Sequence, residues 1–439
     1  MKGNSNNIGI ANLKPTIMFI DMNSFFPSCE QQVNYWLRGR PVGVCVYTGQ
    51  HGSVIALSRE AKARKIKADR LSEIMKKHPE FVPLETNPNR YREFHKRIMK
   101  VLRSFSTEVI PFSIDEAVVD FSSYQLVYKD MEKLANDIKQ KIKEDVGDFM
   151  TCSIGIAPNE FLAKLASELK KPDGLVTISP ENIDEVLSKL ALTDLPGISK
   201  QMALRLVMGG ISSPVELRHA PPEKVKRACK SIVGEFWHFR LNFKEVDMWQ
   251  NSEYRTMQAM RQISNEQRAS VETLHDILYA LCLQLEKRMM HQEVFCHSMS
   301  FSCTYENNSG WSDSINSTVP LQGGEDLYRT FLSRIKEQEE RMEGFRVLNN
   351  EVTRIMIATG GFVQEGLQQY TLFENHSKKD KLRRTVYNVR DKFGFEKIQS
   401  AAELLDKPVM KDVIGFGSIK HLAPEIINDK EPPHWSSMD

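Results

Sequence analysis

Two short apolar runs, far apart in the chain, each adjoin acidic residues, and this arrangement constrains the fold more than any other feature. The run at residues 17–20 ends at Asp21, while Asp115 and Glu116 precede the run at residues 117–119. Apolar runs of this length are typical of buried strands. If the two strands are neighbours in one sheet, three carboxylates come together. Their mutual repulsion is relieved by cations, and hard divalent cations such as Mg²⁺ prefer oxygen ligands.

A carboxylate site of this kind is suited to phosphate chemistry. Two divalent ions, about 3.5–4 Å apart, can stabilise both the attacking and the leaving oxygen of an in-line phosphoryl displacement. The sequence therefore predicts that Asp21, Asp115 and Glu116 are catalytic metal ligands. The alternative is that they are exposed acids at strand ends.

Three motifs in a fixed order resemble those of the Y-family (DinB/UmuC-like) translesion DNA polymerases. They lie at residues 20–30, 113–117 and 153–174, and the third runs from a Ser-Ile-Gly-Ile-Ala-Pro-Asn segment to a Lys-Pro-Asp-Gly turn. The resemblance extends from about residue 15 to about residue 375. It implies a template-directed, low-fidelity DNA polymerase that uses two Mg²⁺ ions, with Mn²⁺ as a possible substitute. Its partners would be primer–template DNA, deoxynucleoside triphosphates and the bacterial sliding clamp.

The resemblance also implies an α+β multidomain fold: a palm with a mixed sheet, small fingers, a helical thumb and a little finger. Residues 255–360 support the last domain independently, because their patterns predict strand, helix, strand, strand, helix, strand, an order that can form a sheet with helices on one face. The expected boundaries are: leader and start of the palm 1–28, fingers 29–79, palm 80–178, thumb with a helix-hairpin-helix 179–250, little finger 251–360 and C-terminal tail 361–439.

Residues after the first acid are expected to contact the incoming nucleotide. By resemblance, Met22 offers its backbone carbonyl to the metal site. Phe26 stands at the steric gate, where a bulky ring excludes a ribose 2′-hydroxyl, and Phe25 lies beside it. The alternative is two core aromatics, which is common for adjacent phenylalanines.

The fingers segment departs from the family pattern. Ser53 and Ile55 lie where the family covers the nascent base pair. Relatives often have Tyr-Glu-Ala-Arg where this chain has the sequence Arg-Glu-Ala-Lys at residues 59–62. Lys62 keeps a cation for the triphosphate but lacks the bidentate geometry of arginine. Arg59 replaces a hydroxyl donor with a cation, and a solvated basic helix face is the alternative for both.

The resemblance also implies one phosphate-binding lysine and one turn that contacts DNA. Lys171, just before the Pro-Asp-Gly turn, corresponds to the family lysine that binds the triphosphate, with the adjacent Lys170 as its rival. Gly197, Ser199 and Lys200 lie in a segment that resembles a helix-hairpin-helix. Such a turn meets a DNA phosphate through backbone N–H groups without selecting sequence.

A candidate DNA contact lies in the first strand of the little finger. Arg255, Met257, Ala259 and Arg261 share one face of this strand, because side chains alternate along it. The two arginines are therefore expected to meet the phosphate backbone. The alternative is that this face packs on helices and the arginines cap its ends.

The tail contains the segment Gln-Tyr-Thr-Leu-Phe at residues 369–373, which resembles the bacterial sliding-clamp-binding pentapeptide. Leu372 and Phe373 are expected to enter an apolar groove while Gln369 fixes the register. A strand edge that packs on the protein body is the alternative. The basic helix expected at residues 378–392 is a second candidate for gripping DNA.

Composition neither supports nor excludes nucleic-acid binding, because the net charge is only +2. The 7 cysteines are dispersed, which favours reduced thiols in a cytosolic protein. The resemblance implies a bacterial cytoplasm, with nucleoid association when on DNA. No membrane partner is expected, since no apolar stretch approaches the roughly 20 residues of a span. Two rival functions are a palm-type nucleotidyl transferase or cyclase and a non-catalytic DNA- or clamp-binding relative. The first has no need of a duplex grip, and the retained acids argue against the second.

Overall fold

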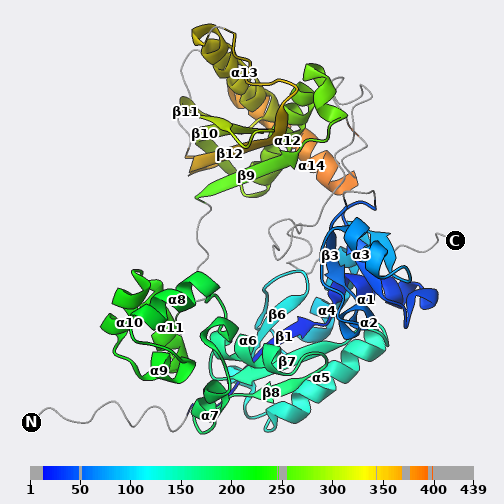
Figure 1. The fold of residues 1–439 in the computed structure, drawn as a ribbon, viewed down its shortest axis with the longest axis vertical. Helices are drawn as coiled ribbons and strands as arrows, with labels where there is room; N and C mark the ends of the chain where they lie inside the picture. Colours follow the sequence, from blue (N-terminus) through cyan, green and yellow to red (C-terminus); the bar gives the residue numbers. More distant parts are fainter. Residues whose placement is uncertain are drawn as a thin grey trace, which may run out of the picture. The chain divides into compact units, whose positions relative to one another are not determined.

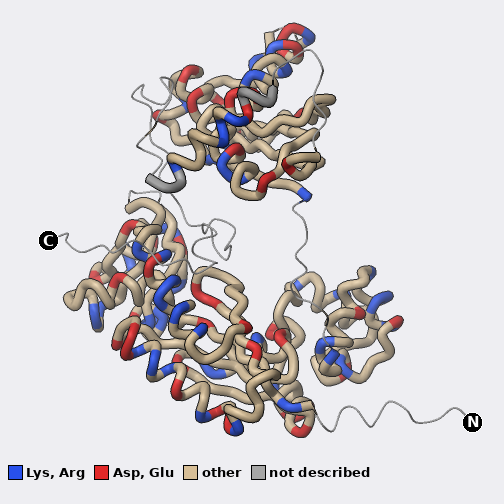
Figure 2. The backbone as a smooth tube through the Cα atoms, turned by 180° about the vertical axis from the view of Figure 1, so that it is seen from behind, with Lys and Arg blue, Asp and Glu red and all other residues tan. Residues whose placement is uncertain are grey.

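A computed structural model of the chain describes residues 13–48, 52–244, 246, 255–342, 344–367, 376–393 and 398. The chain forms two units, one comprising Met1–Met248 with Asp412–Asp439 and the other Trp249–Lys411 (Figure 1). Each unit is described here by itself. Lysines and arginines are interspersed with acidic residues in both units (Figure 2), as the small net charge suggests.

The first unit is built on the five-stranded palm sheet. Its strand order is β5-β6-β1-β7-β8, with β7 and β8 parallel and the other pairs antiparallel. The strands are β1 (Ile17–Met22), β5 (Val109–Pro111), β6 (Glu116–Asp120), β7 (Cys152–Ala157) and β8 (Leu175–Thr177). The predicted neighbourhood of the two acidic strands is confirmed, because β1 pairs with β6 and Asp21 lies opposite Glu116.

Helices cover both faces of this sheet. On one face α4 (Pro88–Arg103) and α5 (Met131–Asp145) pack against alternate strand residues such as Met18 and Ile20. On the other face α6 (Glu160–Leu169) packs against Ile17 and Phe19. Burial on both faces explains why the strands are continuous apolar runs rather than alternating patterns.

The fingers form a separate three-stranded sheet in the order β3-β2-β4, reached from the palm through α1 (Phe25–Val33) and η2 (Tyr35–Leu37). The elements are β2 (Val42–Cys45), β3 (Val54–Leu57), α2 (Arg59–Ala63), α3 (Leu71–Lys77) and β4 (Val82–Glu85). Because β4 pairs in parallel with β2, the fingers extend to residue 85, beyond the expected boundary at residue 79.

The thumb consists of short helices, as predicted from its proline and glycine content. They are α7 (Ile183–Ser188), η4 (Leu192–Asp194), α8 (Lys200–Met208), α9 (Pro214–His219), α10 (Pro222–Cys229) and α11 (Val233–Leu241). The thumb shares a hydrophobic core with α6 of the palm, to which Phe161 and Trp237 both belong. A further short helix, η3 (Ser122–Tyr124), follows β6 in the palm.

The second unit has the expected little-finger order, strand-helix-strand-strand-helix-strand. Its elements are β9 (Thr256–Gln262), η5 (Gln267–Ala269), α12 (Val271–His291), β10 (Val294–Tyr305), β11 (Gly310–Leu321), α13 (Gly324–Arg341) and β12 (Val352–Gln364). The antiparallel sheet has the order β11-β10-β12-β9. Apolar residues of one sheet face form a core with α12 and α13, which leaves the other face uncovered by these helices.

The tail helix α14 (His376–Phe393) belongs to this second unit, so the unit extends past the boundary expected at residue 360. Arg383 forms an ion pair with Asp326 at 3.0 Å, and Arg384 forms one with Glu365 at 2.9 Å. These contacts make both arginines part of the domain surface and weaken the case for this helix as a DNA grip.

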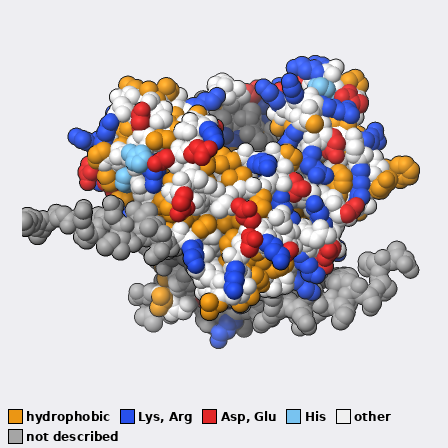
Figure 3. All heavy atoms as spheres, turned by 90° about the horizontal axis from the view of Figure 1, so that it is seen from below, with side chains coloured by type: hydrophobic (Ala, Val, Ile, Leu, Met, Phe, Trp, Pro, Cys, Tyr) orange, Lys and Arg blue, Asp and Glu red, His pale blue; other side chains and the backbone are white. Residues whose placement is uncertain are grey.

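Among the helices that the structure describes, none combines the length and apolar character of a membrane span. On the face seen in Figure 3, hydrophobic side chains lie in small groups among charged ones.

Candidate active site

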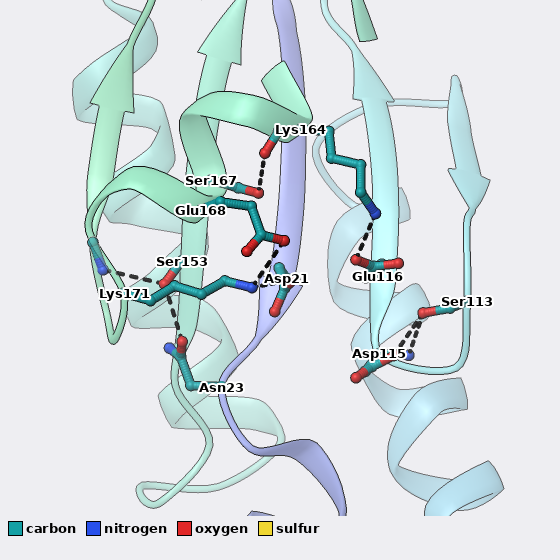
Figure 4. Close-up of polar contacts among 11 residues, drawn as sticks. Asp21, Asn23, Ser113, Asp115, Glu116, Ser153, Lys164, Ser167, Glu168 and Lys171 are labelled. Atoms are coloured by element: carbon teal, nitrogen blue, oxygen red, sulfur yellow. Dashed lines mark hydrogen bonds and ion pairs between the residues drawn. The ribbon is translucent and has the colours of Figure 1, made fainter. Parts of the chain in front are cut away.

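The palm sheet brings two of the predicted ligands together. Asp21 at the end of β1 and Glu116 at the start of β6 are directly opposite in the antiparallel register. Each offers a carboxylate oxygen to a cluster that also includes Glu168 of α6, with the three oxygens within 4.8 Å of one another (Figure 4). Glu168 was not predicted, because the path of α6 across the sheet brings it to the site and no sequence spacing indicates that path.

Two lysines form ion pairs with these carboxylates. The Lys171 ammonium donates to Asp21 Oδ2 at 2.7 Å and lies 3.3 Å from Glu168 Oε1. Lys164 of α6 donates to Glu116 Oε1 at 2.9 Å (Figure 4). Of the two rival lysines, Lys171 therefore reaches the carboxylate cluster through a hydrogen bond.

Asp115, the third predicted ligand, lies just before β6 and is held by its own loop. Its Oδ1 accepts a hydrogen bond from the hydroxyl of Ser113 at 2.6 Å, and its backbone carbonyl accepts one from the amide of Met22 at 2.9 Å. The loop is also fixed from α4, because Nδ1 of the buried His95 lies 2.8 Å from the carbonyl oxygen of Ile114. These contacts keep Asp115 beside the first strand.

Burial dominates the electrostatics of the site. Burial raises the pKa of Asp21 to about 7, although the Lys171 ammonium works against this shift. Burial likewise raises the pKa of Asp115. A buried carboxylate with a raised pKa lacks sufficient positive charge around it. The site therefore fits divalent cations, which prefer oxygen donors and would stabilise the ionised carboxylates.

Asn23 does not join the carboxylate cluster. It is buried, and its side-chain amide lies 3.0 Å from the hydroxyl of Ser153 on β7. Its backbone N–H donates to the carbonyl of Thr151 at 2.8 Å. Asn23 thus fixes the turn after Asp21 to the neighbouring strand.

Both predicted nucleotide-contact phenylalanines are buried in the palm core, as the alternative interpretation expected. The ring of Phe26 is stacked on that of Tyr91 in α4, with ring centroids 4.5 Å apart. Phe25 is tilted against Phe26 at 5.8 Å. Tyr91 was not predicted as part of this arrangement, because its sequence context is that of an ordinary amphipathic helix.

The fingers residues lie at different depths. Ser53 is exposed and bridges to Arg70, while the half-buried Ile55 packs against the palm core. Burial and the nearby Lys171 ammonium lower the pKa of Lys62, and the carboxylates of Asp21 and Asp115 oppose this shift. The Lys62 amine is therefore within electrostatic reach of the site.

The predicted hairpin of the thumb has the geometry of a tight turn. Gly197 adopts a positive φ of 85°, which glycine tolerates best. Ser199 caps α8 by accepting a hydrogen bond from the amide of Met202 at 3.3 Å, and Lys200 is the first helical residue. Gly197, Ser199 and Lys200 are all exposed, so this turn is accessible to a ligand.

The little-finger arginines follow the alternative interpretation. Met257 and Ala259, which share the strand face of Arg255 and Arg261, are buried in the core of the domain. The arginines therefore lie at the two ends of a face that packs on helices. The candidate clamp-binding residues Gln369, Leu372 and Phe373 lie outside the residues that the structure describes.

The chain matches the impB/mucB/samB family over residues 20–168 and the C-terminal domain of that family over residues 257–372. DNA polymerase IV 1 of Bacillus subtilis (strain 168) is 28% identical over 401 residues, which cover 88% of this chain and 93% of the relative. DNA polymerase IV of Moorella thermoacetica is 36% identical over 228 residues, covering 51% of this chain and 56% of the relative.

Solved structures support the same fold. A Y-family DNA polymerase chimera superposes with a TM-score of 0.66 at 22% identity, covering 80% of this chain and 99% of that chain. An insertion ternary complex of Dbh DNA polymerase superposes with a TM-score of 0.54 at the same identity and coverage. The expected α+β architecture with a C-terminal sheet domain is thus confirmed.

Proposed function

Because the chain belongs to the Y family of DNA polymerases and is a DNA-directed translesion polymerase, we propose that Asp21, Asp115 and Glu116 form its nucleotidyl-transfer centre. The reaction joins a primer 3′-hydroxyl to the α-phosphate of a deoxynucleotide and releases pyrophosphate. The observation that carries the proposal is the pairing of Asp21 with Glu116 across β1 and β6 beside the Lys171 ammonium.

We propose two Mg²⁺ ions as the cofactor, with Mn²⁺ as a substitute. Asp21, Asp115 and Glu116 would hold them together with the backbone carbonyl of Met22. When bound, such ions polarise phosphate oxygens and favour the ionised form of the attacking hydroxyl. The protein's own contribution is to keep the carboxylates buried and correctly spaced.

The remaining site residues divide by role. Lys171 and Lys62 provide positive charge for the triphosphate, and Arg59 supports nucleotide binding from the start of α2. Phe26, backed by Tyr91, limits the space beneath the sugar, with Phe25 beside it. Ser53 and Ile55 lie over the nascent base pair. An ammonium group serves such a site as a mobile point charge for phosphate oxygens.

DNA and clamp binding extend the proposal beyond the palm. The exposed turn of Gly197, Ser199 and Lys200 would meet a backbone phosphate of the duplex. Gln369, Leu372 and Phe373 would bind the bacterial sliding clamp, which places the enzyme in the cytoplasm, on the nucleoid when it is engaged with DNA. Replacing Leu372 and Phe373 with alanine is expected to abolish clamp-stimulated synthesis and spare basal synthesis.

Primer extension with Mg²⁺ tests the catalytic proposal. Asp115→Ala is expected to reduce extension roughly a thousandfold, which corresponds to a loss of about 4 kcal/mol in transition-state stabilisation. DNA binding should persist, because Asp115 is not part of the thumb turn that is proposed to meet the duplex. Asp120→Ala is the matched control, since Asp120 lies at the opposite end of β6, facing Ile17. Near-normal extension by a folded Asp115→Ala protein would remove Asp115 from the centre.

A further inference from the structure

Arg59 begins a helix that is too short to be stable alone. α2 has five residues, and Ser58 caps it by accepting a hydrogen bond from the amide of Ala61 at 3.2 Å. Helices shorter than about 12–15 residues are marginal in water, so contacts with the rest of the protein must hold α2 in place. One such contact runs from Gln31 Nε2 to Glu60 Oε2 at 3.1 Å. A second is made by Arg59.

The Arg59 side chain connects the fingers to the palm. Its guanidinium carbon lies 4.6 Å from the centre of the Phe149 ring, and Nη1 donates to Thr151 Oγ1 at 3.3 Å. A planar guanidinium is attracted to an aromatic face and can hydrogen-bond in its own plane at the same time. Both contacts are made to the palm loop that leads into β7.

Phe149 is itself a fixed platform. Its backbone N–H donates to Gln32 Oε1 at 2.8 Å. The guanidinium of Arg38 also lies over its ring, at 5.0 Å, and Arg38 makes two hydrogen bonds of 2.9 Å to the neighbouring Asp148. Because other contacts hold Phe149 in place, its ring can restrict the position of the Arg59 guanidinium.

This contact adjoins the nucleotide site. The carbonyl of Thr151 accepts a hydrogen bond from the amide of Asn23 at 2.8 Å, two residues after Asp21. Lys62 follows Arg59 by three residues, so the two side chains share one face of α2. A fixed Arg59 therefore also fixes the direction of Lys62, whose charge is coupled to Asp21 and Asp115.

We propose that Arg59 is a positioning residue for the incoming nucleotide: its contacts with Phe149 and Thr151 hold α2 against the palm so that Lys62 faces the triphosphate. This inference rests on the polymerase function proposed above. It assigns Phe149 a part in nucleotide binding that acts through Arg59. The competing explanation is that Arg59 binds the triphosphate directly.

Steady-state primer extension with two conservative variants separates these explanations. Phe149→Leu keeps an apolar side chain but removes the aromatic face, and Arg59→Lys keeps the charge but cannot stack and hydrogen-bond as a planar group does. Each is expected to raise the KM for deoxynucleotides about 3- to 10-fold, the range expected for one partly buried cation–aromatic contact, with kcat nearly unchanged. The double variant should be no worse than the more affected single variant, because both remove one contact.

Two further proteins complete the test. In a Lys62→Ala background, Arg59→Lys should have little additional effect, since the group that it positions is gone. Arg97→Lys is the matched control: Arg97 lies over Phe94 at 5.9 Å on α4, and its side chain is 54% exposed. It should leave KM unchanged. Nucleotide binding to the protein–DNA complex with Ca²⁺ in place of Mg²⁺ gives the same comparison without turnover.

Each outcome is decisive. If Phe149→Leu is neutral while Arg59→Lys raises KM, Arg59 is a direct phosphate ligand and the positioning role is wrong. If both are neutral, the contact has no part in nucleotide binding. If Arg59→Lys remains fully additive with Lys62→Ala, Arg59 does not act through Lys62. Failure of the polymerase proposal would be recognised separately, because the wild-type protein would then not extend primers.

Discussion

The ammonium of Lys171 lies 2.7 Å from Oδ2 of Asp21 and only partly offsets the burial that raises the pKa of this carboxyl to about 7. Glu168 shares the same ammonium at 3.3 Å. When a triphosphate enters the site, the Lys171 ammonium can move from the carboxylates to the phosphate oxygens. Glu168 then remains as a second carboxylate near the position that the ammonium has left. The lysine therefore compensates the charge of the buried carboxylates only in part before substrate arrives.

This relationship distinguishes two adjacent lysines. Lys171→Ala is expected to raise the deoxynucleotide KM about 10- to 100-fold, the effect of losing a charge-assisted hydrogen bond. Lys170→Ala is the natural control, because it removes the same charge one residue away. Steady-state primer extension measures both. Equal effects of the two substitutions would mean that general charge, rather than the contact of Lys171, supports nucleotide binding.

The raised pKa of Asp21 predicts how stability depends on pH and metal. The pKa of this carboxyl is about 7 in the folded protein, against an ordinary value of 3.8. Between these two pH values the carboxyl is therefore protonated in the folded protein but ionised in the unfolded chain. Without metal, Asp21 therefore lowers stability as pH rises through this window. Divalent cations need the ionised carboxylate, so Mg²⁺ should bind more tightly above pH 7.

Thermal unfolding checks this prediction. Mg²⁺ is expected to raise the melting temperature of the first unit more at about pH 8 than at about pH 5.5, because binding to the native state stabilises it. Asp21→Asn cannot ionise at this position, so its response to Mg²⁺ should be smaller than that of the wild-type protein and should differ less between the two pH values. An equal shift at both pH values for the wild-type protein would contradict the assignment.

His95 predicts a pH dependence of the opposite sign. Burial lowers the pKa of His95 from 6.5 to about 4. Between these two pH values the imidazole is therefore neutral in the folded protein but protonated in the unfolded chain. The stability that the neutral His95 side chain contributes is present above pH 6.5 and is lost as the pH falls toward 4. The loss is about 1.4 kcal/mol in the free energy of unfolding for each pH unit. His95→Gln can still donate to the Ile114 carbonyl but cannot titrate. Urea unfolding at pH 7 and pH 5 should show a smaller loss in the variant, and an equal loss would show that other groups dominate.

Phe26 and Phe25 are adjacent, but only Phe26 stacks closely on Tyr91. Phe26→Ala is expected to admit ribonucleotides while deoxynucleotide incorporation persists, because a ring that excludes the 2′-hydroxyl is removed. Phe25→Ala is the matched control, since both substitutions create a cavity in the same core. The measurement is the ratio of kcat/KM for deoxynucleotide and ribonucleotide. Unchanged selectivity in Phe26→Ala and altered selectivity in Phe25→Ala would move the gate to Phe25.

The sequence predicted the features that depend on local pattern. The acids beside apolar runs identified β1 and β6 as neighbours, and the alternation of strand and helix identified the little finger. Glu168 and Lys164 escaped prediction because they enter the site through the path of α6 across the sheet, which no spacing encodes. The basic pattern of α14 suggested a free DNA grip, whereas Arg383 is paired with acids contributed by other elements of the domain.

The little finger provides the last prediction, and here the structure changes the choice of residues. One face of its sheet is buried beneath α12 and α13, so we expect DNA to approach the other face. Exposed residues of that open face include Gln258, Ser312 and Ser314, while Arg255 and Arg261 lie at the ends of the buried one. Uncharged hydroxyl and amide groups can hydrogen-bond to a phosphate but do not neutralise it. Such contacts therefore do not release the counterions condensed on the DNA.

Two variants therefore separate the faces. Ser314→Glu places a negative charge on the open face and is expected to weaken primer–template binding strongly, because it repels the phosphate backbone. The double variant Arg255→Ala, Arg261→Ala should change the slope of log affinity against log salt only slightly. Two lost phosphate contacts would instead make that slope shallower by about 1.8, or 0.9 for each. A change of that size, with a neutral Ser314→Glu, would show that DNA follows the ends of β9 rather than the open sheet.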